Sequence, residues 1–286
     1  MSPRWFVRVF ALVAASATTT AQIPDAPSVL AAARQALGGD ATLNAVTSFT
    51  VDGSLTRFRE PPPGDIAWTR SDDLYTRLDI RCLLPDKFVR GLRRSVSVND
   101  SDVPIYAYHG FNGSLPFGTG GPARPTARDL AHIFVEHVLP LFATSFAVYP
   151  MDFTAAGRVQ LATGLADTVD VRGPDEFTWR LFLDGASHLP IKLTWTDRPV
   201  VERVLSPPSM FSSYSLPSFH PAELAPVEWE LVIGDYRRKD GLNWPHRLTT
   251  SMGGRKHDEV RLGTFKINPK VDPRQFSGAY LRSNPF

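Results

Sequence analysis

The residue types that most often build catalytic or metal sites form only a few close groups in this chain. His132 and His137, in the segment HIFVEH, are the closest pair of histidines. Two histidines that bind zinc from one helical face are normally four residues apart, as in H-E-x-x-H. A spacing of five turns them about 140° apart on a helix. The pair therefore favours ordinary helix-surface histidines, and we expect no metal ligands and no cofactor.

The sequence patterns of other catalytic sites are also missing or incomplete. No G-x-S-x-G elbow of an esterase is present, and the GTGGP segment at 118–122 lacks the Lys-Ser/Thr of a phosphate-binding loop. The adjacent acids Asp72-Asp73 and Asp258-Glu259 would face opposite ways on a strand, so neither pair can act on one substrate. We therefore expect no catalytic residues and no enzyme, with a hydrolase that uses an unrecognised site as the least favoured alternative.

The amino-acid composition limits the classes of partner that we expect for this protein. The chain has 286 residues, 43% hydrophobic and 11% aromatic, which is enough for one sizeable core. A net charge of +2 is too mild to indicate a nucleic-acid partner. The closest basic group, Arg90, Arg93 and Arg94, is typical of a solvated strand face.

The first residues, MSPRWFVRVFALVAASATTTAQ, have the layout of a secretory signal peptide. Arg4 and Arg8 precede a short apolar run, and small residues follow up to Ala21. The run is about half the length of roughly 20 residues that a membrane span needs. We predict a signal peptide over 1–21, a single domain over 22–286, a periplasmic or secreted location and no stable membrane span after cleavage. Cys82, the only cysteine, fits burial better than a dimer link.

The mature chain opens with helical residues and then changes to strands. DAPSVLAAARQALGGD predicts a helix with Asp25 or Ser28 as its N-cap and an end at Gly38-Gly39. From Phe49 onward apolar residues alternate with polar ones in several segments, as in Phe49, Val51 and Leu55. One-sided strands of this kind indicate an antiparallel sheet with one covered face. The predicted class is mainly β (α+β).

Two segments interrupt the strands. Residues 129–146 carry apolar side chains at a period near 3.6, which predicts a helix that lies across the concave side of the sheet, with a kink at Pro140. Ser206 to Pro226 is rich in proline and serine, and a loop of this length in a compact domain is usually functional or mobile.

Two Asp-Gly pairs mark hairpins. Asp184-Gly185 and Asp240-Gly241 each follow a strand pattern, and each precedes a second strand whose predicted first residue is a proline, Pro190 or Pro245. Glycine permits the positive φ of a tight reversal, and a proline at the start of a strand gives up an amide outside the ladder. We therefore predict a repeated hairpin in an up-and-down sheet.

These motifs resemble the LolA-like outer-membrane lipoprotein-sorting superfamily of bacterial periplasmic proteins. The likeness is carried by ALGGDATLNAVTSFTVDGSLT, LPDKFVR with YHGFNG, LDGASHLPIKLTW, KDGLNWPHRLTT and FKINPKVDPRQFS, within residues 29 to 277. The resemblance implies a curved antiparallel half-barrel with an N-terminal helix and helices across the concave face. It also implies a hydrophobic cavity for acyl chains of lipids or lipoproteins.

Large apolar side chains are the positive signal for a ligand. We predict a cavity lined by Phe134, Leu141, Phe142, Trp179, Leu181, Trp195 and Trp229. The favoured function is a binding protein or carrier for an acyl chain, with a lipid or acylated protein as partner. The alternative is a non-enzymatic cell-envelope scaffold with a filled core, which binds an envelope protein.

Overall fold

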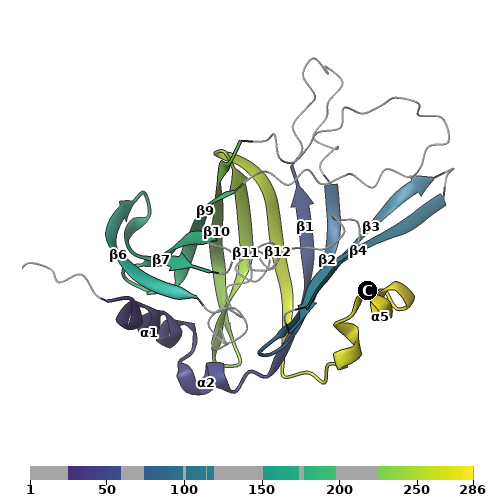
Figure 1. Ribbon diagram of the computed structural model, residues 1–286, viewed down its shortest axis with the longest axis horizontal. Helices are drawn as coiled ribbons and strands as arrows, with labels where there is room; N and C mark the ends of the chain where they lie inside the picture. The colour runs from purple at the N-terminus through teal and green to yellow at the C-terminus, as the bar shows by residue number, and fades with distance from the viewer. Residues whose placement is uncertain are drawn as a thin grey trace, which may run out of the picture.

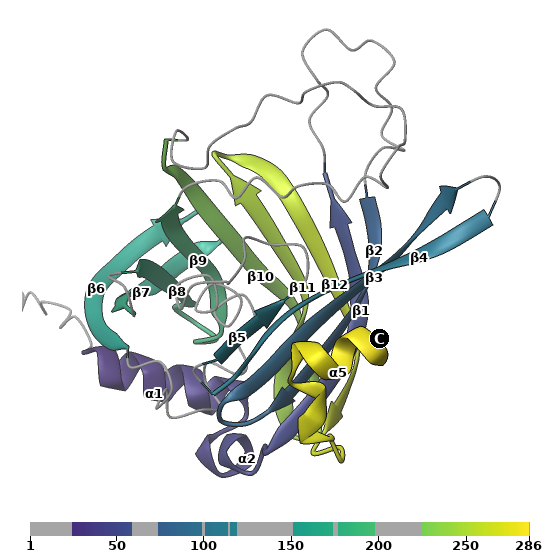
Figure 2. The same ribbon diagram turned by 45° about the vertical axis from the view of Figure 1, so that its right-hand side comes forward.

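The computed structural model describes residues 25–58, 74–98, 101–113, 115–118, 151–173, 177–197 and 225–285. Within them the chain forms one 12-stranded antiparallel sheet, in the order β5-β4-β3-β2-β1-β12-β11-β10-β9-β8-β7-β6. The sheet curves strongly and does not close, because β5 and β6 are its two edges (Figures 1 and 2). The predicted half-barrel is confirmed. The strands are β1 (Ser48–Arg57), β2 (Leu74–Leu83), β3 (Lys87–Val98), β4 (Ser101–Asn112), β5 (Leu115–Gly118), β6 (Asp152–Leu161), β7 (Gly164–Arg172), β8 (Thr178–Asp184), β9 (Pro190–Asp197), β10 (Val227–Lys239), β11 (Leu242–Met252) and β12 (Arg255–Ile267).

The alternation in the sequence separates an inner face from an outer face. On β1, Phe49, Val51 and Leu55 are buried on the inner face, while the intervening Asp52 and Ser54 lie on the outer face. The same alternation continues on both sides of β1, and the inner side chains join one cluster. Cys82 belongs to this cluster with 1% of its surface exposed, so its predicted burial is confirmed.

Two short helices cover one end of the inner face. α1 (Ala26–Leu37) begins at Asp25, whose carboxylate accepts the Ser28 amide hydrogen at 2.9 Å, and it ends at Gly38 with φ of 146°. Its buried residues join the cluster of the inner face. The chain continues into α2 (Asp40–Asn44) below β11 (Figure 1). Asn243 Nδ2 donates to the carbonyl of Ala36 at 2.6 Å and fixes α1 to β11.

The Asp240-Gly241 hairpin forms as predicted. Lys239 pairs directly with Leu242, so the loop has two residues, and φ is 51° at Asp240 and 81° at Gly241. Positive φ at both loop residues is the turn geometry that fits the twist of the flanking strands. Pro245, however, is the fourth residue of β11 and not its first. It pairs with Tyr236 beside an irregularity at Asp235, and no β12 residue pairs with it.

The Asp184-Gly185 loop is different. Pro190 begins β9 as predicted, but the turn is longer, and Gly185 does not have positive φ. The carboxylate of Asp184 accepts the amide hydrogen of Ser187 at 2.7 Å and so organises the turn. A Cβ at Gly185 would lie 2.8 Å from the carbonyl oxygen of Leu165, so glycine is needed here for close approach. The two hairpins therefore share the Asp-Gly sequence but differ in loop length and turn geometry.

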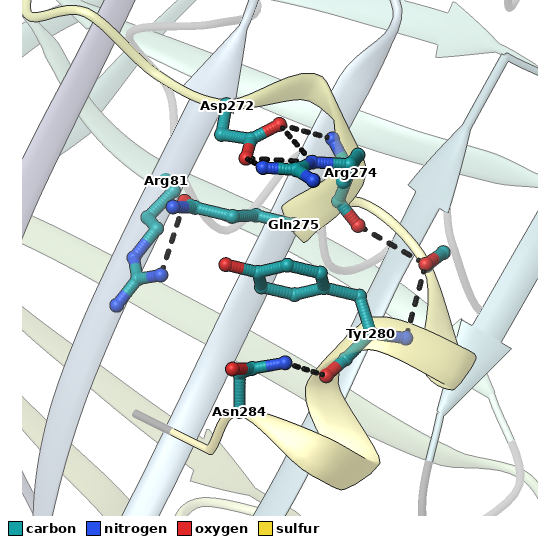
Figure 3. A network of polar contacts seen from close by, with 7 residues as sticks. Arg81, Asp272, Arg274, Gln275, Tyr280 and Asn284 are labelled. Carbon is teal, nitrogen blue, oxygen red and sulfur yellow. Dashed lines mark hydrogen bonds and ion pairs between the residues drawn. The ribbon is translucent and has the colours of Figure 1, made fainter.

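The C-terminal segment packs on the outer face. It contains η4 (Pro273–Gln275) and α5 (Gly278–Ser283), and Phe276 and Leu281 are buried against β3 and β4. Arg81 Nη1 donates to Gln275 Oε1 at 3.1 Å (Figure 3), and Tyr108 donates its hydroxyl hydrogen to the Gly278 carbonyl at 3.0 Å. These contacts hold α5 beside β3 and β4 (Figure 2).

Several predictions concern residues outside the described ranges. These are the signal peptide over 1–21, the helix over 129–146 with Phe134, Leu141 and Phe142, the pair His132 and His137, and nearly all of the loop from Ser206 to Pro226.

Candidate ligand-binding face of the sheet

Three tryptophans lie side by side on the inner face. Trp179 of β8 pairs with Trp195 of β9, and Trp195 pairs with Trp229 of β10. Directly paired residues project from the same face of a sheet. The register therefore sets the three indoles in one line across three strands, which we call the tryptophan row. Two residues away from the tryptophan on each strand, a second line runs parallel to the first. It is formed in the same way by Leu181, Leu193 and Leu231.

The tryptophan row combines tight packing with unused polar groups. The rings of Trp195 and Trp229 stack with centroids 6.0 Å apart and planes at 5°. Trp179 is 3% exposed and Trp195 is 6% exposed. The indole nitrogens of Trp179 and Trp229 are buried, yet neither has a hydrogen-bond acceptor among the described residues. Each of these indole N–H groups can donate one hydrogen bond.

An irregularity in β12 places a histidine against this row. The register between β11 and β12 shifts after Thr250, which pairs with Asp258, whereas Ser251 pairs with Lys256. His257 is the extra residue of this β-bulge, and bulges commonly redirect a side chain. Its ring meets that of Trp229 edge-on, with centroids 5.4 Å apart and planes at 74°.

An ion pair lies beside the histidine. Asp258 accepts two hydrogen bonds from the guanidinium of Arg57 on β1, at 2.8 and 2.9 Å, and His257 Nδ1 lies 3.2 Å from Asp258 Oδ2. Burial alone would raise the pKa of Asp258, but its contacts with His257 and Arg57 hold that pKa well below its usual range. We call these three residues the Arg57–Asp258–His257 cluster.

The cluster marks a change of polarity along the inner face. Leu55 and Val260, two residues deeper on β1 and β12, pair with each other and are buried in the apolar cluster. Arg57 and Asp258 occupy the same face but carry full charges, with side chains 20% and 13% exposed. Along β1 and β12 the inner face is thus apolar below this level and polar at it. Such a surface suits a molecule with a hydrocarbon body and a polar end.

The structure describes four of the seven residues that the sequence predicted to line a cavity. Trp179, Leu181, Trp195 and Trp229 are brought together on the inner face, as the alternation indicated. Phe134, Leu141 and Phe142 lie outside the described residues. Sequence reasoning missed the Arg57–Asp258–His257 cluster, although it did place Asp258 and Glu259 on opposite faces. Glu259 lies on the outer face, where it binds Lys256 and Arg261.

The structure places the arginines of the basic group on β3 on two different faces of the sheet. Arg93 is exposed on the outer face, whereas Arg90 pairs with Ile80 of the inner face and has a buried Nε atom. The expectation of one solvated face is therefore wrong for Arg90. A strand sends alternate residues to opposite faces, so three nearby arginines cannot share one.

The described ranges hold neither a cluster of metal ligands nor a helix that could span a membrane. In that part of the chain, no three His, Cys, Asp or Glu side chains gather closely enough to hold a metal ion. None of the described helices has the length and apolar character to cross a bilayer.

Known proteins of the same shape exist, although neither a protein-family model nor a curated protein matches the sequence. A solved LolA superfamily protein from Nitrosomonas europaea aligns with 90% of this chain and 100% of its own, at a TM-score of 0.50 and 11% sequence identity. The fold is LolA-like. A solved DUF1329 family protein from Desulfovibrio piger aligns with 90% of this chain and 98% of its own, at a TM-score of 0.49 and 6% identity. The LolA-like fold confirms the architecture that the sequence motifs implied.

Proposed function

We propose that this LolA-like chain binds the acyl chain of a lipid or lipoprotein on the inner face of its sheet, as a carrier or binding protein of the bacterial periplasm. The supporting observation is the continuous apolar inner face that runs from β2 through β1, β12, β11, β10 and β9 to β7. Among the described helices, α1 and α2 meet this face, and they do so at one end (Figure 1).

The energetics favour such a guest. Each methylene moved from water into an apolar site contributes about 0.8 kcal/mol, so a chain of ten methylenes gains roughly 8 kcal/mol before the cost of ordering. The tryptophan row and the leucine line beneath it offer broad apolar contact. The Arg57–Asp258–His257 cluster would then lie beside the polar end of the guest.

The predicted helix over 129–146 is the second part of the proposed binding site. We assign it the role of a cover over the acyl chain, with Phe134, Leu141 and Phe142 toward the guest. The proposal also places the mature chain, 22–286, in the periplasm or outside the cell after removal of 1–21.

A binding role fits the electrostatics better than a catalytic one. Asp258 contacts His257, which packs against the tryptophan row, and Arg57 and His257 hold the pKa of Asp258 well below the usual range. A general base works best when its pKa is near the working pH. Asp258 is therefore a poor proton acceptor, and we propose a non-enzymatic protein.

The test uses a fatty acid that carries bromine on its hydrocarbon chain, because bromine quenches tryptophan fluorescence on contact. The triple variant Trp179→Phe, Trp195→Phe, Trp229→Phe removes the row and should lose most of the quenching. The matched control is Trp244→Phe. Trp244 is fully buried against Phe49 and Phe265, away from the row, so this variant should keep the quenching.

Native mass spectrometry of protein purified from its own envelope would then identify the cargo. Failure of the wild-type chain to be quenched by the brominated fatty acid would reject the proposal.

A second candidate is an envelope scaffold with a filled core. The observation in its favour is that Trp179, Leu181 and Trp195 are already 3%, 0% and 6% exposed. A scaffold should show no uptake of fatty acid and no change of thermal stability when fatty acid is added. A carrier should show both, because a ligand that binds only the native state raises its stability.

A further inference from the structure

Four arginines form a line across the outer face of the sheet. Arg93 on β3 pairs with Arg77 on β2, and Arg77 pairs with Ser54 on β1. On the other side of Ser54, Arg261 of β12 pairs with it, and Arg247 of β11 pairs with Arg261. Neighbouring strands are about 4.8 Å apart, so this line is about 19 Å long. We call Arg93, Arg77, Arg261 and Arg247 the arginine row.

The row faces solvent. Its four side chains are exposed, and they lie opposite to the buried inner residues of the same strands, such as Leu78 on β2. Arg93 lies over the ring of Tyr106, 5.8 Å from the centroid, which orients it along the surface. Arg247 lies beside Gly234, which has no side chain to cover it.

The row is costly to the fold. Like charges directly opposite each other on neighbouring strands are destabilising, and Arg77–Arg93 and Arg247–Arg261 are two such pairs. A bound anion would remove this cost.

The acids on the same face form most of their ion pairs with cations outside the row. Glu259 binds Arg261 at 2.7 Å but also binds Lys256 at 2.6 Å. Asp79 binds Arg81 at 2.8 Å, and Asp235 binds Arg237 at 2.6 Å. Asp52 accepts the backbone amide hydrogen of Thr264. Within the described ranges, the three members Arg77, Arg93 and Arg247 therefore make no salt bridge.

We propose that the arginine row docks the protein onto the anionic phospholipid head groups of a bilayer. Guanidinium groups bind phosphate oxygens in a planar, bidentate manner. A line of exposed guanidinium groups matches a surface that presents many phosphates better than it matches one small anion. Val232, 42% exposed, lies on the same face two residues from Gly234 and adds an apolar contact. The choice of a bilayer over an acidic protein rests on the proposed function, because a carrier of acyl chains must approach a membrane.

The test measures sedimentation of the mature chain with vesicles of phosphatidylglycerol and phosphatidylethanolamine, and with vesicles of phosphatidylcholine alone. The row variant is Arg77→Gln, Arg93→Gln, Arg247→Gln. The control variant, Arg172→Gln, Arg180→Gln, Arg238→Gln, removes the same charge from exposed positions on β7, β8 and β10.

Each basic residue near an anionic bilayer contributes about a fivefold factor in affinity, so the row variant should bind about a hundredfold more weakly. The control variant should bind nearly as well as the wild type. Binding of the wild type should weaken with added salt and should be absent on phosphatidylcholine.

Two results would overturn docking on lipid. Equal losses in the row and control variants would show that net charge alone matters. Binding of the wild type to polyglutamate but not to the anionic vesicles would assign the row to an acidic protein. Thermal unfolding should show the row variant as stable as the wild type, since it removes like-charge pairs. Uptake of fatty acid, measured on the same variants, separates a failure of docking from a failure of the proposed function.

Discussion

Arg57 and Asp258 face each other across β1 and β12, although 201 residues separate them in the chain. The sheet order explains the contact, because the first strand pairs with the last and so joins the two halves of the sheet. The two hydrogen bonds between them are the polar part of a seam whose other inner contacts are apolar, such as Leu55 with Val260.

Removing one member of this pair should destabilise the seam. Asp258→Asn leaves the largely buried Arg57 without its anion, and hydrogen bonds to charged groups contribute about 1.5–3 kcal/mol. We expect the free energy of unfolding in urea to fall by about 2 kcal/mol. The double variant Arg57→Gln, Asp258→Asn should lose less than the sum of its two single variants. Strict additivity would contradict an interaction between the two residues.

The same pair predicts a pH dependence. The pKa of Asp258 is lower in the folded chain than the ordinary value of about 3.9 in an unfolded chain. A carboxylate of this kind stabilises the fold fully above its unfolded pKa, and the contribution disappears as pH falls toward the folded pKa. The stability difference between wild type and Asp258→Asn should be constant near neutral pH and should shrink below about pH 4. Asp79 has a raised pKa through burial, but it is present in both proteins and cancels.

The two hairpin glycines should both resist substitution, for different reasons. Gly241→Val forces a β-branched residue to φ of 81°, and Gly185→Val places a Cβ 2.8 Å from the Leu165 carbonyl oxygen. We expect each to cost at least about 1–3 kcal/mol in the free energy of unfolding. Gly234→Ala is the control, because it does not have positive φ and its nearest neighbour would be 3.9 Å from the new Cβ. A similar loss in all three would point to a general strand effect.

The thiol of Cys82 should be unreactive in the native state. It is fully buried, and burial raises the pKa of its thiol well above the ordinary value. Since the thiolate is the reactive form, a disulfide reagent should label the native protein only at the rate of unfolding. Labelling should become immediate in denaturant. Fast labelling of the native chain, with normal thermal stability, would place the thiol at the surface.

The sequence allowed the faces of the strands to be predicted, but not their alignment. A period of two assigns Trp179, Trp195 and Trp229 to an inner face without knowledge of their partners. Their meeting in one row depends on the register, which hairpin loops and bulges set. The bulge that redirects His257 and the first-to-last strand pairing that brings Arg57 to Asp258 leave no local signal. The strands β4, β5, β6 and β7 were also missed. β4 contains Pro104 and Gly110, which weaken a strand pattern. β6 is an edge strand with Gly157 at positive φ and no fully buried residue.

The last prediction concerns the segment 129–146, which the sequence predicts to be helical. If this helix is a displaceable cover over an acyl chain, Phe142→Asp should leave the sheet folded and reduce fatty-acid uptake. Each methylene of the guest contributes about 0.8 kcal/mol only while water is excluded from it. A polar gap that wets three methylenes should therefore weaken binding by roughly 50-fold.

If the helix is a permanent part of the core, the same change buries an unpaired charge, and the fold should lose several kcal/mol with or without lipid. Phe142→Leu is the matched control and should keep both uptake and stability. We expect thermal unfolding of Phe142→Asp in the absence of lipid to match the wild type within a few degrees, while its uptake falls. A large drop in the unfolding temperature without lipid would favour the scaffold with a filled core.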